Sequence, residues 1–389
     1  MSSSDNFGPA AIRVDLGAIF VSLELSRKTW LLTSVCPGER EKVSRKSLAA
    51  GDVAGLLALL EQLKDRVRER TGRDYRIVCI QEAGLDGFWL HRVLESHGVE
   101  SWVVDPASIA VNRRQRRAKT DNIDGEKLLD ALMGFLRGDR DACKMVRPPS
   151  VEDEDRRRPC RERQVLLRER IGHTNRIKGL LFSQGISDYD PILKNRRTQL
   201  EGLTTGDGRP LPEHMKRQIL REIDRLERVM EQLRQVEADR DALLQPAPAA
   251  EPRPRPGANL TQLKGIAEER AATLGAECLW RTFANQRQVT GYAGLGGTPF
   301  QSGKTDREQG ISKAGNKHVR RTMIELAWSW LQYQPQSELS LWFQRRLGQA
   351  PDRRRKKVLI AALARKLLIA LWRFDTQGVV PPGAAFKTA

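Results

Sequence analysis

The chain has 389 residues, of which 39% are hydrophobic and 30% are charged. Its 67 Lys and Arg residues outnumber its 49 Asp and Glu residues, which gives a formal net charge of +18 at pH 7. This composition excludes a disordered chain, and the excess of positive charge favours a polyanionic partner, nucleic acid ahead of an anionic membrane.

Residues 358–372 form the most apolar long stretch, but Arg365 and Lys366 interrupt it. A membrane-spanning helix needs roughly 20 mostly apolar residues. The N-terminus lacks a signal-peptide pattern. The five cysteines are scattered and form no CxxC pair, which argues against a zinc site or a disulfide framework. We therefore predict a cytoplasmic, nucleoid-associated protein with no membrane partner.

Residues 1–148 show the pattern of a mixed α/β sheet domain. Residues 19–25 and 29–35 alternate apolar and polar side chains around a short Ser-Arg-Lys turn, which predicts a β-hairpin. Residues 52–70 have apolar side chains at helical spacing, with Asp52 as a candidate N-cap. A buried strand that ends near Glu82, a helix closed by a glycine and a further strand are expected next.

A basic run, NRRQRRAK, leads into a further predicted helix. That helix begins in the sequence TDNIDGEKLLDALMGFLRG, and either Thr120 or Asp121 can cap it. The run itself could contact nucleic acid. Its candidate residues are Arg113, Arg114, Arg116, Arg117 and Lys119.

The rest of the chain divides into three parts. Residues 149–244 are rich in Arg, Glu and Leu, and apolar residues between positions 219 and 233 alternate at spacings of four and three. This predicts a helical hairpin or coiled-coil arm, although half of an ordinary helix bundle fits equally well. Residues 245–258 form a proline-rich linker. Residues 259–389 read as mainly helical, with a Gly-rich, non-helical stretch at 291–317.

Four carboxylates are candidates for chemistry. Asp121 and Asp124 lie three residues apart and share one helix face, where their charges repel unless a cation or strong donors offset them. Simple helix capping explains this pair equally well. Glu24, inside the first strand, and Glu82, at the end of a buried strand, are costly to bury without compensation. Two divalent ions, Mg²⁺ or Mn²⁺, spaced about 4 Å apart would supply it.

Several segments carry a resemblance to a known family. They are LELSRKTW, QEAGLDGFWLHRVL, VVDPASIAVNRRQRRAKTDNIDGEKL, LKGIAEERAATL, FANQRQVTGYAGLGGTPFQSG and GISKAGNKHVRRTMIELAW. Together, in this order, they resemble the DEDD-type transposases of bacterial insertion sequences, a family that includes pilin-gene invertases and bridge-RNA-guided recombinases. The resemblance implies a RuvC-like N-terminal domain with an RNase H-like fold, and a C-terminal domain with a serine loop.

The family's four acids map onto Glu24, Glu82, Asp121 and Asp124. This sequence departs from the family pattern at the first position, where Glu24 stands in place of the usual Asp of a G-I-D-V-S-K motif. Asp15 is a competing candidate. We prefer Glu24 because the residues after it, SRKTW, continue the family hairpin.

The resemblance also points to Ser302 in PFQSG as a nucleophile that attacks the DNA phosphate and holds the strand covalently. A serine beside Gly303 can approach a phosphate closely, although a loop serine in a turn hydrogen bond is the plain alternative. Ser312 is the rival serine. With Gly315 and Asn316, it resembles a helix start whose backbone N–H groups could hold phosphate.

LKGIAEERAATL resembles a helix–hairpin–helix, whose central turn binds a DNA backbone. Ala267 stands where such motifs usually have glycine, so a packing role for Leu263 and Ile266 is an equal alternative. Two further basic clusters, residues 156–158 and 353–357, could contribute to a nucleic-acid surface or simply be solvated.

We expect a transposase or recombinase that cuts and rejoins DNA with Mg²⁺ (or Mn²⁺), the carboxylates and Ser302. By resemblance, it would act as a homodimer or homotetramer, with the metal site of one subunit near the serine of another, and with a guide (bridge) RNA. One alternative is a RuvC-like metal-dependent junction nuclease with no covalent step. Another is a non-catalytic nucleic-acid-binding protein derived from a transposase.

Overall fold

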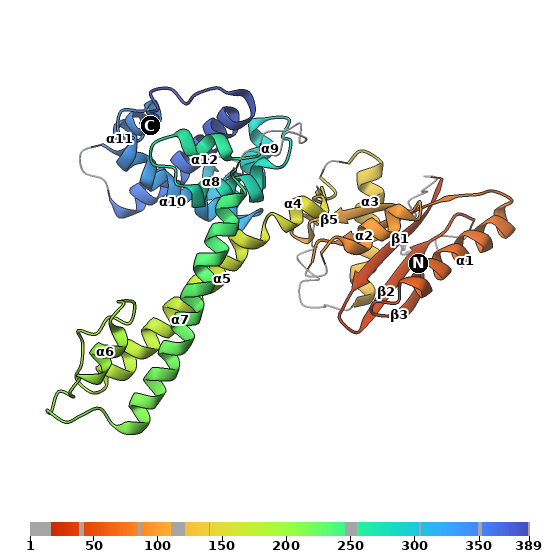
Figure 1. Ribbon diagram of the computed structural model, residues 1–389. Coiled ribbons are helices and arrows are strands. Elements are labelled where there is room, and N and C mark those ends of the chain that lie inside the picture. Colours follow the sequence, from red (N-terminus) through yellow and green to blue (C-terminus); the bar gives the residue numbers. More distant parts are fainter. Residues whose placement is uncertain are drawn as a thin grey trace, which may run out of the picture. The chain divides into compact units, whose positions relative to one another are not determined.

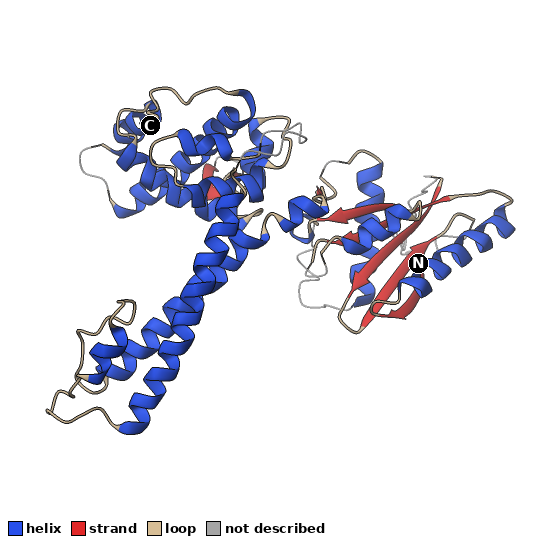
Figure 2. Ribbon diagram, in the orientation of Figure 1, coloured by secondary structure: helices blue, strands red, loops and turns tan. Residues whose placement is uncertain are grey.

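The computed structural model describes residues 17–38, 43–84, 87–109, 121–139, 141–245, 255–302, 305–348 and 352–387, with the side chains of 121–123 and 298–309 outside the description. The chain divides into two compact units, Met1–Pro149 and Ser150–Ala389. Figures 1 and 2 show the helices and strands of each unit. The finer division into four segments stays a prediction.

The first unit is built on a six-stranded sheet of order β3-β2-β1-β4-β5-β6. Its strands are β1 (Ala18–Leu25), β2 (Thr29–Val35), β3 (Ser44–Ala49), β4 (Arg76–Glu82), β5 (Glu100–Val104) and β6 (Met145–Val146). β1, β2 and β3 form an antiparallel meander, β1, β4 and β5 run parallel, and β6 is antiparallel to β5. The prediction of a mixed α/β domain is confirmed.

Helices pack on both faces of this sheet because successive side chains of each strand point to opposite faces. On β1, Ile19, Val21 and Leu23 pack with residues of α1 (Val53–Thr71) and α2 (Trp89–Ser96). Ala18 and Phe20 instead pack against α3 (Asp121–Leu136). Each large apolar side chain buried in this way contributes about 1.5–3 kcal/mol.

The predicted β1–β2 hairpin and the helix that follows are confirmed. The side chain of Asp52 caps α1, since its Oδ1 accepts a 2.8 Å hydrogen bond from the Gly55 amide. Two strands, β3 and β6, were not predicted from the sequence. β3 carries the polar sequence SRKSLA and pairs with β2 on one side, so it lacks the apolar alternation of a central strand. β6 has two residues.

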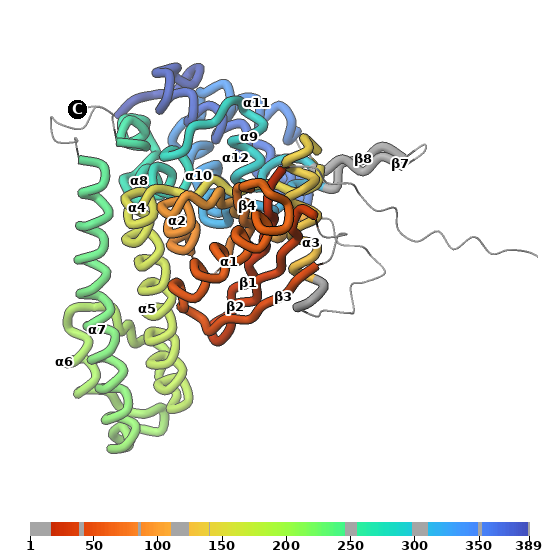
Figure 3. Tube along the Cα trace, turned by 90° about the vertical axis from the view of Figure 1, so that its right-hand side faces the viewer, coloured from red at the N-terminus to blue at the C-terminus, as the bar shows by residue number. Residues whose placement is uncertain are grey.

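In the second unit, two long helices lie side by side as a helical hairpin (Figure 1; Figure 3). They are α5 (Arg158–Phe182) and α7 (Glu213–Ala242), with α4 (Val151–Asp155) before them and α6 (Arg196–Glu201) between them. The apolar seam predicted for α7 is buried at Ile219, Ile223, Leu226 and Leu233, while Met230 is partly buried. We name this pair of helices the arm.

The rest of the second unit is mainly helical around one apolar core. Its elements are η3 (Ala258–Gln262), α8 (Glu268–Leu274), the π-helical turn η4 (Gly275–Leu279), α9 (Gln286–Tyr292), α10 (Lys317–Tyr333), α11 (Glu338–Leu347) and α12 (Arg353–Gln377). A β-hairpin, β7 (Gly297–Ser302) and β8 (Thr305–Ile311), occupies the Gly-rich stretch. We name it the serine hairpin.

Candidate functional site

The register of the parallel strands places Glu24 and Glu82 at the same height. β1 and β4 pair from Ala18 with Arg76 to Leu23 with Gln81, so the next residues, Glu24 and Glu82, are neighbours across the two strands. Adjacent strands lie about 4.8 Å apart. The alternation that turns Phe20 toward α3 also turns Glu24 toward that face.

On that face, α3 approaches β1 and β2 closely at Gly125. The Ser22 hydroxyl donates a 2.8 Å buried hydrogen bond to the Gly125 carbonyl. A Cβ at position 125 would lie 2.5 Å from Thr33 Oγ1 and 2.8 Å from Glu24 Oε1. Glycine is therefore required for this approach, and it brings the first turn of α3 beside the carboxylate of Glu24.

The two predicted aspartates belong to this first turn of α3. Asp121 is the first residue of the helix, and its side chain lies outside the described residues. Asp124 is half-buried, and its Oδ1 accepts a 3.3 Å contact from Lys127 Nζ. The backbone thus brings Glu24, Glu82 and the aspartate pair to one corner of the sheet, at the carboxyl ends of β1 and β4. Contrary to the expectation of two buried acids, Glu24 is half-buried and Glu82, the last residue of β4, is exposed.

This corner offers carboxylate oxygens, the ligand type that Mg²⁺ and Mn²⁺ prefer. In their present rotamers, the side chains that the structure describes do not gather three His, Cys, Asp or Glu residues closely enough to hold a metal ion. The donor set and its backbone placement fit a divalent ion. To bind such an ion, the side chains of Glu24, Glu82 and Asp124 would have to turn toward one another, and Asp121 would have to supply a further ligand.

Ser302 is the last residue of β7 and pairs with Thr305, the first residue of β8. Its side chain lies outside the described residues, and so does Gly303. Ser312 lies just after the hairpin, where its amide donates a 2.8 Å hydrogen bond to the Gly296 carbonyl. Asn316 caps α10 by accepting from the amides of His318 and Val319, so the predicted helix start is present.

The other predicted residues are buried in the core, exposed on the surface or outside the described residues. Leu263 and Ile266 of the helix–hairpin–helix-like segment are fully buried in the apolar core, and Ala267 precedes α8 at its N-cap position. Asp15 lies outside the described residues, as do the five basic residues of the run, Arg113, Arg114, Arg116, Arg117 and Lys119. The cluster at 353–357 begins α12 and is exposed.

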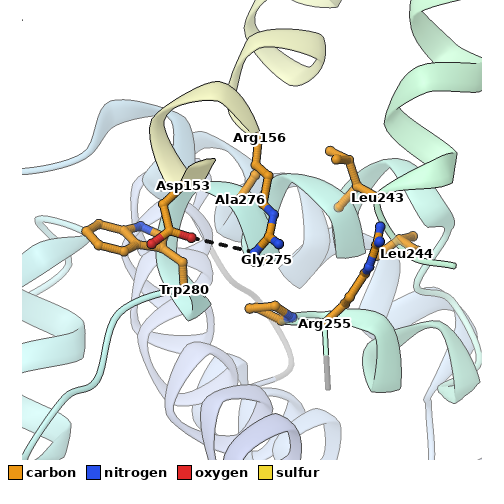
Figure 4. Close-up of a pocket in the computed structure, with 10 residues that line it drawn as sticks. Asp153, Arg156, Leu243, Leu244, Arg255, Gly275, Ala276 and Trp280 are labelled. Atoms are coloured by element: carbon orange, nitrogen blue, oxygen red, sulfur yellow. Dashed lines mark ion pairs between the residues drawn. The ribbon is translucent and has the colours of Figure 1, made fainter. Parts of the chain in front are cut away.

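The cluster at residues 156–158 is partly structural. Arg157 is buried, and its guanidinium lies 4.6 Å from the ring centroid of Trp280 while Nε donates to the Ala276 carbonyl. Arg156 and Asp153 form an ion pair at a neighbouring pocket that Trp280 also lines (Figure 4). With a volume of about 20 Å³, the pocket has room for a single water and not for a nucleotide.

An ionic contact between Arg161 and Glu277, at the base of the serine hairpin, was not predicted from the sequence. Glu277 is fully buried in η4, and both of its carboxylate oxygens accept hydrogen bonds from Arg161 on α5, at 2.6 and 3.0 Å. The segment 275–279 shows no charge pattern that would have indicated it. Glutamate side chains are rarely buried completely in proteins, so a position for Glu277 in the core was not expected.

Comparisons with known proteins decide the family. The sequence profile described as "Transposase IS116/IS110/IS902 family" matches residues 257–340, which include the serine hairpin. The protein "Putative transposase y4rJ" of Sinorhizobium fredii is 56% identical over 386 residues, which cover 98% of this chain and 97% of that protein. The chain belongs to the IS116/IS110/IS902 transposase family.

A more distant relative supports the same family membership. The "Transposase for insertion sequence element IS1328" of Yersinia enterocolitica is 26% identical over 266 residues, 67% of this chain and 73% of that protein. As a member of a transposase family, the protein has DNA as a partner and is an enzyme that cuts and rejoins it. Within the described residues, no helix is long and apolar enough to cross a bilayer.

Proposed function

We propose that this transposase cuts and rejoins DNA with two sets of residues, the carboxylates Glu24, Glu82, Asp121 and Asp124 and the nucleophile Ser302. The observation that carries the proposal is the β1–β4 register, which aligns Glu24 with Glu82 beside the first turn of α3. A catalytic corner at the carboxyl ends of parallel strands is a common location for a site in α/β sheets.

The proposal includes an RNase H-like (RuvC-like) fold for the first unit and coiled-coil packing for the arm. The antiparallel meander β3-β2-β1, followed by the parallel strands β4 and β5, supports the first part. The regular burial of Ile219, Ile223 and Leu226 on α7 supports the second.

In this mechanism, the four carboxylates would hold Mg²⁺ (or Mn²⁺), which when bound supplies positive charge to the reacting phosphate. The Ser302 hydroxyl attacks the phosphorus of a DNA phosphodiester, and the bond from phosphorus to one ester oxygen breaks. The departing strand end takes the serine proton and leaves as a hydroxyl, while the other end stays on the serine as a phosphoester. Attack of a DNA hydroxyl on that phosphoester rejoins the strand and restores the serine.

The carboxylates are tested by the double variant Asp121→Asn/Asp124→Asn. We expect Mg²⁺-dependent strand cleavage to be lost, because neutral amides are poor ligands for a hard cation, while DNA binding is kept. Asp130→Asn, an exposed acid on the same helix, is the matched control and should cleave normally. Full cleavage by the double variant would contradict the proposal, and so would an equal loss in the control.

We also propose that a structured guide (bridge) RNA directs the protein and that it assembles as a homodimer or homotetramer. The formal net charge of +18 supports a second polyanionic partner beside DNA. Sequencing of RNA that co-purifies with the protein should return one discrete species encoded next to its gene, whereas a spread of unrelated RNAs would contradict guidance.

Light scattering of the DNA complex should give the mass of two or four chains, and the mass of one would contradict assembly.

A further inference from the structure

Glu277 lies in an unusual backbone segment. The turn η4 is a single turn of π-helix that directly follows α8, and the Trp280 amide closes it by donating to the Gly275 carbonyl. Single π-helical turns change the direction of the side chains that they carry and occur frequently at functional sites. Here the turn places a carboxylate in a fully buried position, where its charge is costly unless it is fully compensated.

Three hydrogen bonds from side chains compensate the Glu277 carboxylate. Arg161 donates from Nε and Nη2 in a two-pronged pair, and Asn316 Nδ2 donates to Oε2 at 2.9 Å. Burial acts to raise the pKa of Glu277, but the hydrogen bonds and charge of Arg161 outweigh it and lower the pKa below its ordinary value. The carboxylate therefore stays ionised and keeps both partners in fixed orientations.

Asn316 and Tyr292 bracket the segment that contains the serine hairpin. The backbone N–H of Asn316 donates a 2.7 Å hydrogen bond to the Tyr292 carbonyl, which closes the segment at its base. The Tyr292 hydroxyl donates to the backbone carbonyl of Glu277 at 2.8 Å. Glu277 thus contacts both flanks of the segment that carries Ser302, one through its carboxylate and the other through its carbonyl.

The arm is bonded to the same place. Arg161 belongs to the first turn of α5, and one turn further along the helix Gln164 Oε1 lies 2.9 Å from His318 Nδ1 at the start of α10. A rotation or shift of α5 therefore acts directly on the base of the serine hairpin. Within this network Glu277 is fully buried, while Arg161 is exposed and Asn316 is half-buried. The buried carboxylate has few alternative arrangements that satisfy both of its oxygens.

We propose that Glu277 is a positioning residue for Ser302, which joins α5 of the arm, through Arg161, to the base of the serine hairpin, through Asn316. This inference rests on the proposed function, since it assigns a purpose to the placement of Ser302. It predicts that the ion pair affects the rate of strand cleavage rather than the affinity for DNA.

The test compares Glu277→Gln and Arg161→Gln with the control Arg197→Gln. Arg197 also makes a two-pronged pair with a glutamate, Glu227, but away from the hairpin, on α6. We expect both test variants to lower strand cleavage at saturating DNA by about 10- to 100-fold, since small misplacements of a reacting group cost rates of this size. The dissociation constant for DNA should stay within about twofold, and the control should cleave normally.

Two further measurements separate positioning from general damage to the fold. Amide hydrogen exchange at residues 292–316 should become faster in Glu277→Gln, whereas exchange in the sheet of the first unit should not change. Arg161→Lys keeps the positive charge but cannot make the two-pronged hydrogen bond of a guanidinium. It should therefore recover part of the cleavage that is lost in Arg161→Gln. Asn316→Ser keeps an N-cap for α10 but removes the amide donor, so it tests the same link if Glu277→Gln fails to fold.

The inference is overturned if the hairpin amides exchange at the wild-type rate in Glu277→Gln and in Asn316→Ser, or if Glu277→Gln and the Arg197→Gln control lose cleavage equally. Failure of the proposed function gives a different result. In that case Ser302→Ala keeps full cleavage, while hydrogen exchange still reports whether Glu277 holds the base of the hairpin.

Discussion

The hydroxyl of Ser22 donates a hydrogen bond to the backbone carbonyl of Gly125, 103 residues later in the chain, and so fixes α3 against the central strand of the sheet. Because this contact is buried, both of its groups would lose a hydrogen-bond partner if α3 moved away. The glycine lets the helix backbone lie directly against Thr33 and Glu24. The position of the aspartates on α3 therefore depends on a residue that carries no chemistry of its own.

We predict that Gly125→Ala reduces both stability and strand cleavage. The added methyl group would overlap Thr33 Oγ1, and its accommodation should cost about 1–3 kcal/mol in the free energy of unfolding, measured in urea. Gly179→Ala on α5 is the matched control, since a Cβ there meets no atom within 4 Å. It should be neutral or stabilising by up to about 1 kcal/mol. Equal stability of the two variants would refute the close approach.

Much of the first unit could be predicted from apolar alternation and capping alone. β1, β2 and α1 show strong periodicity, and Asp52 marks the helix start where the structure has it. β3 could not be found in this way, because an edge strand rich in Lys and Arg lacks an apolar face. Likewise, no local signal distinguishes the π-helical turn η4 from a continuation of α8.

The candidate site was predictable in its residue types but not in its geometry. Glu24 and Glu82 were identified because an acid buried in a strand is costly, but Glu24 is only half-buried and Glu82 is exposed. Their proximity comes instead from the register of β1 and β4, which sets the two acids side by side when continued by one residue. Strand register depends on pairing between distant segments, so the sequence alone does not fix it. Arg161 and Glu277 are 116 residues apart, and nothing in their local sequence indicates that they meet.

In the proposed set of four acids, Glu24 stands where the resemblance described above leads us to expect an aspartate. We expect Glu24→Asp to raise strand cleavage, because the shorter side chain restores the family's usual ligand at this position. Glu24→Gln should lower cleavage by about 100-fold or more, a loss typical of a group that stabilises charge in the transition state. Asp15→Asn serves as the comparison. If it abolished cleavage while Glu24→Gln had no effect, the assignment would move to Asp15.

Asp375 makes the stability of the second unit dependent on pH. Burial raises the pKa of this carboxyl to about 6, although hydrogen bonds from the Gly257 amide oppose the rise. The folded state therefore binds the proton more tightly than the unfolded state, and stability falls as the pH rises from about 4 to about 6. The loss is on the order of 2–3 kcal/mol.

The variant Asp375→Asn should remove this pH dependence, since the amide cannot ionise. We expect it to unfold at a higher temperature than the wild type at pH 7 and at a similar temperature at pH 4. The measurement is thermal unfolding at a series of pH values. A wild-type melting temperature that rises between pH 4 and 6, with Asp375→Asn less stable at pH 7, would show that the assigned pKa direction is wrong.

The most direct test of the account is to trap the reaction on DNA and identify the residue that carries the strand. After incubation with Mg²⁺ and a DNA that contains the ends of the insertion sequence, the protein is denatured and digested, and its peptides are mapped by mass spectrometry. We predict a nucleotide adduct on Ser302 that is absent from Ser302→Ala and retained in Ser312→Ala. Efficient strand cleavage by Ser302→Ala, with no adduct on the wild-type protein, would contradict the account and favour a metal-dependent nuclease without a covalent step.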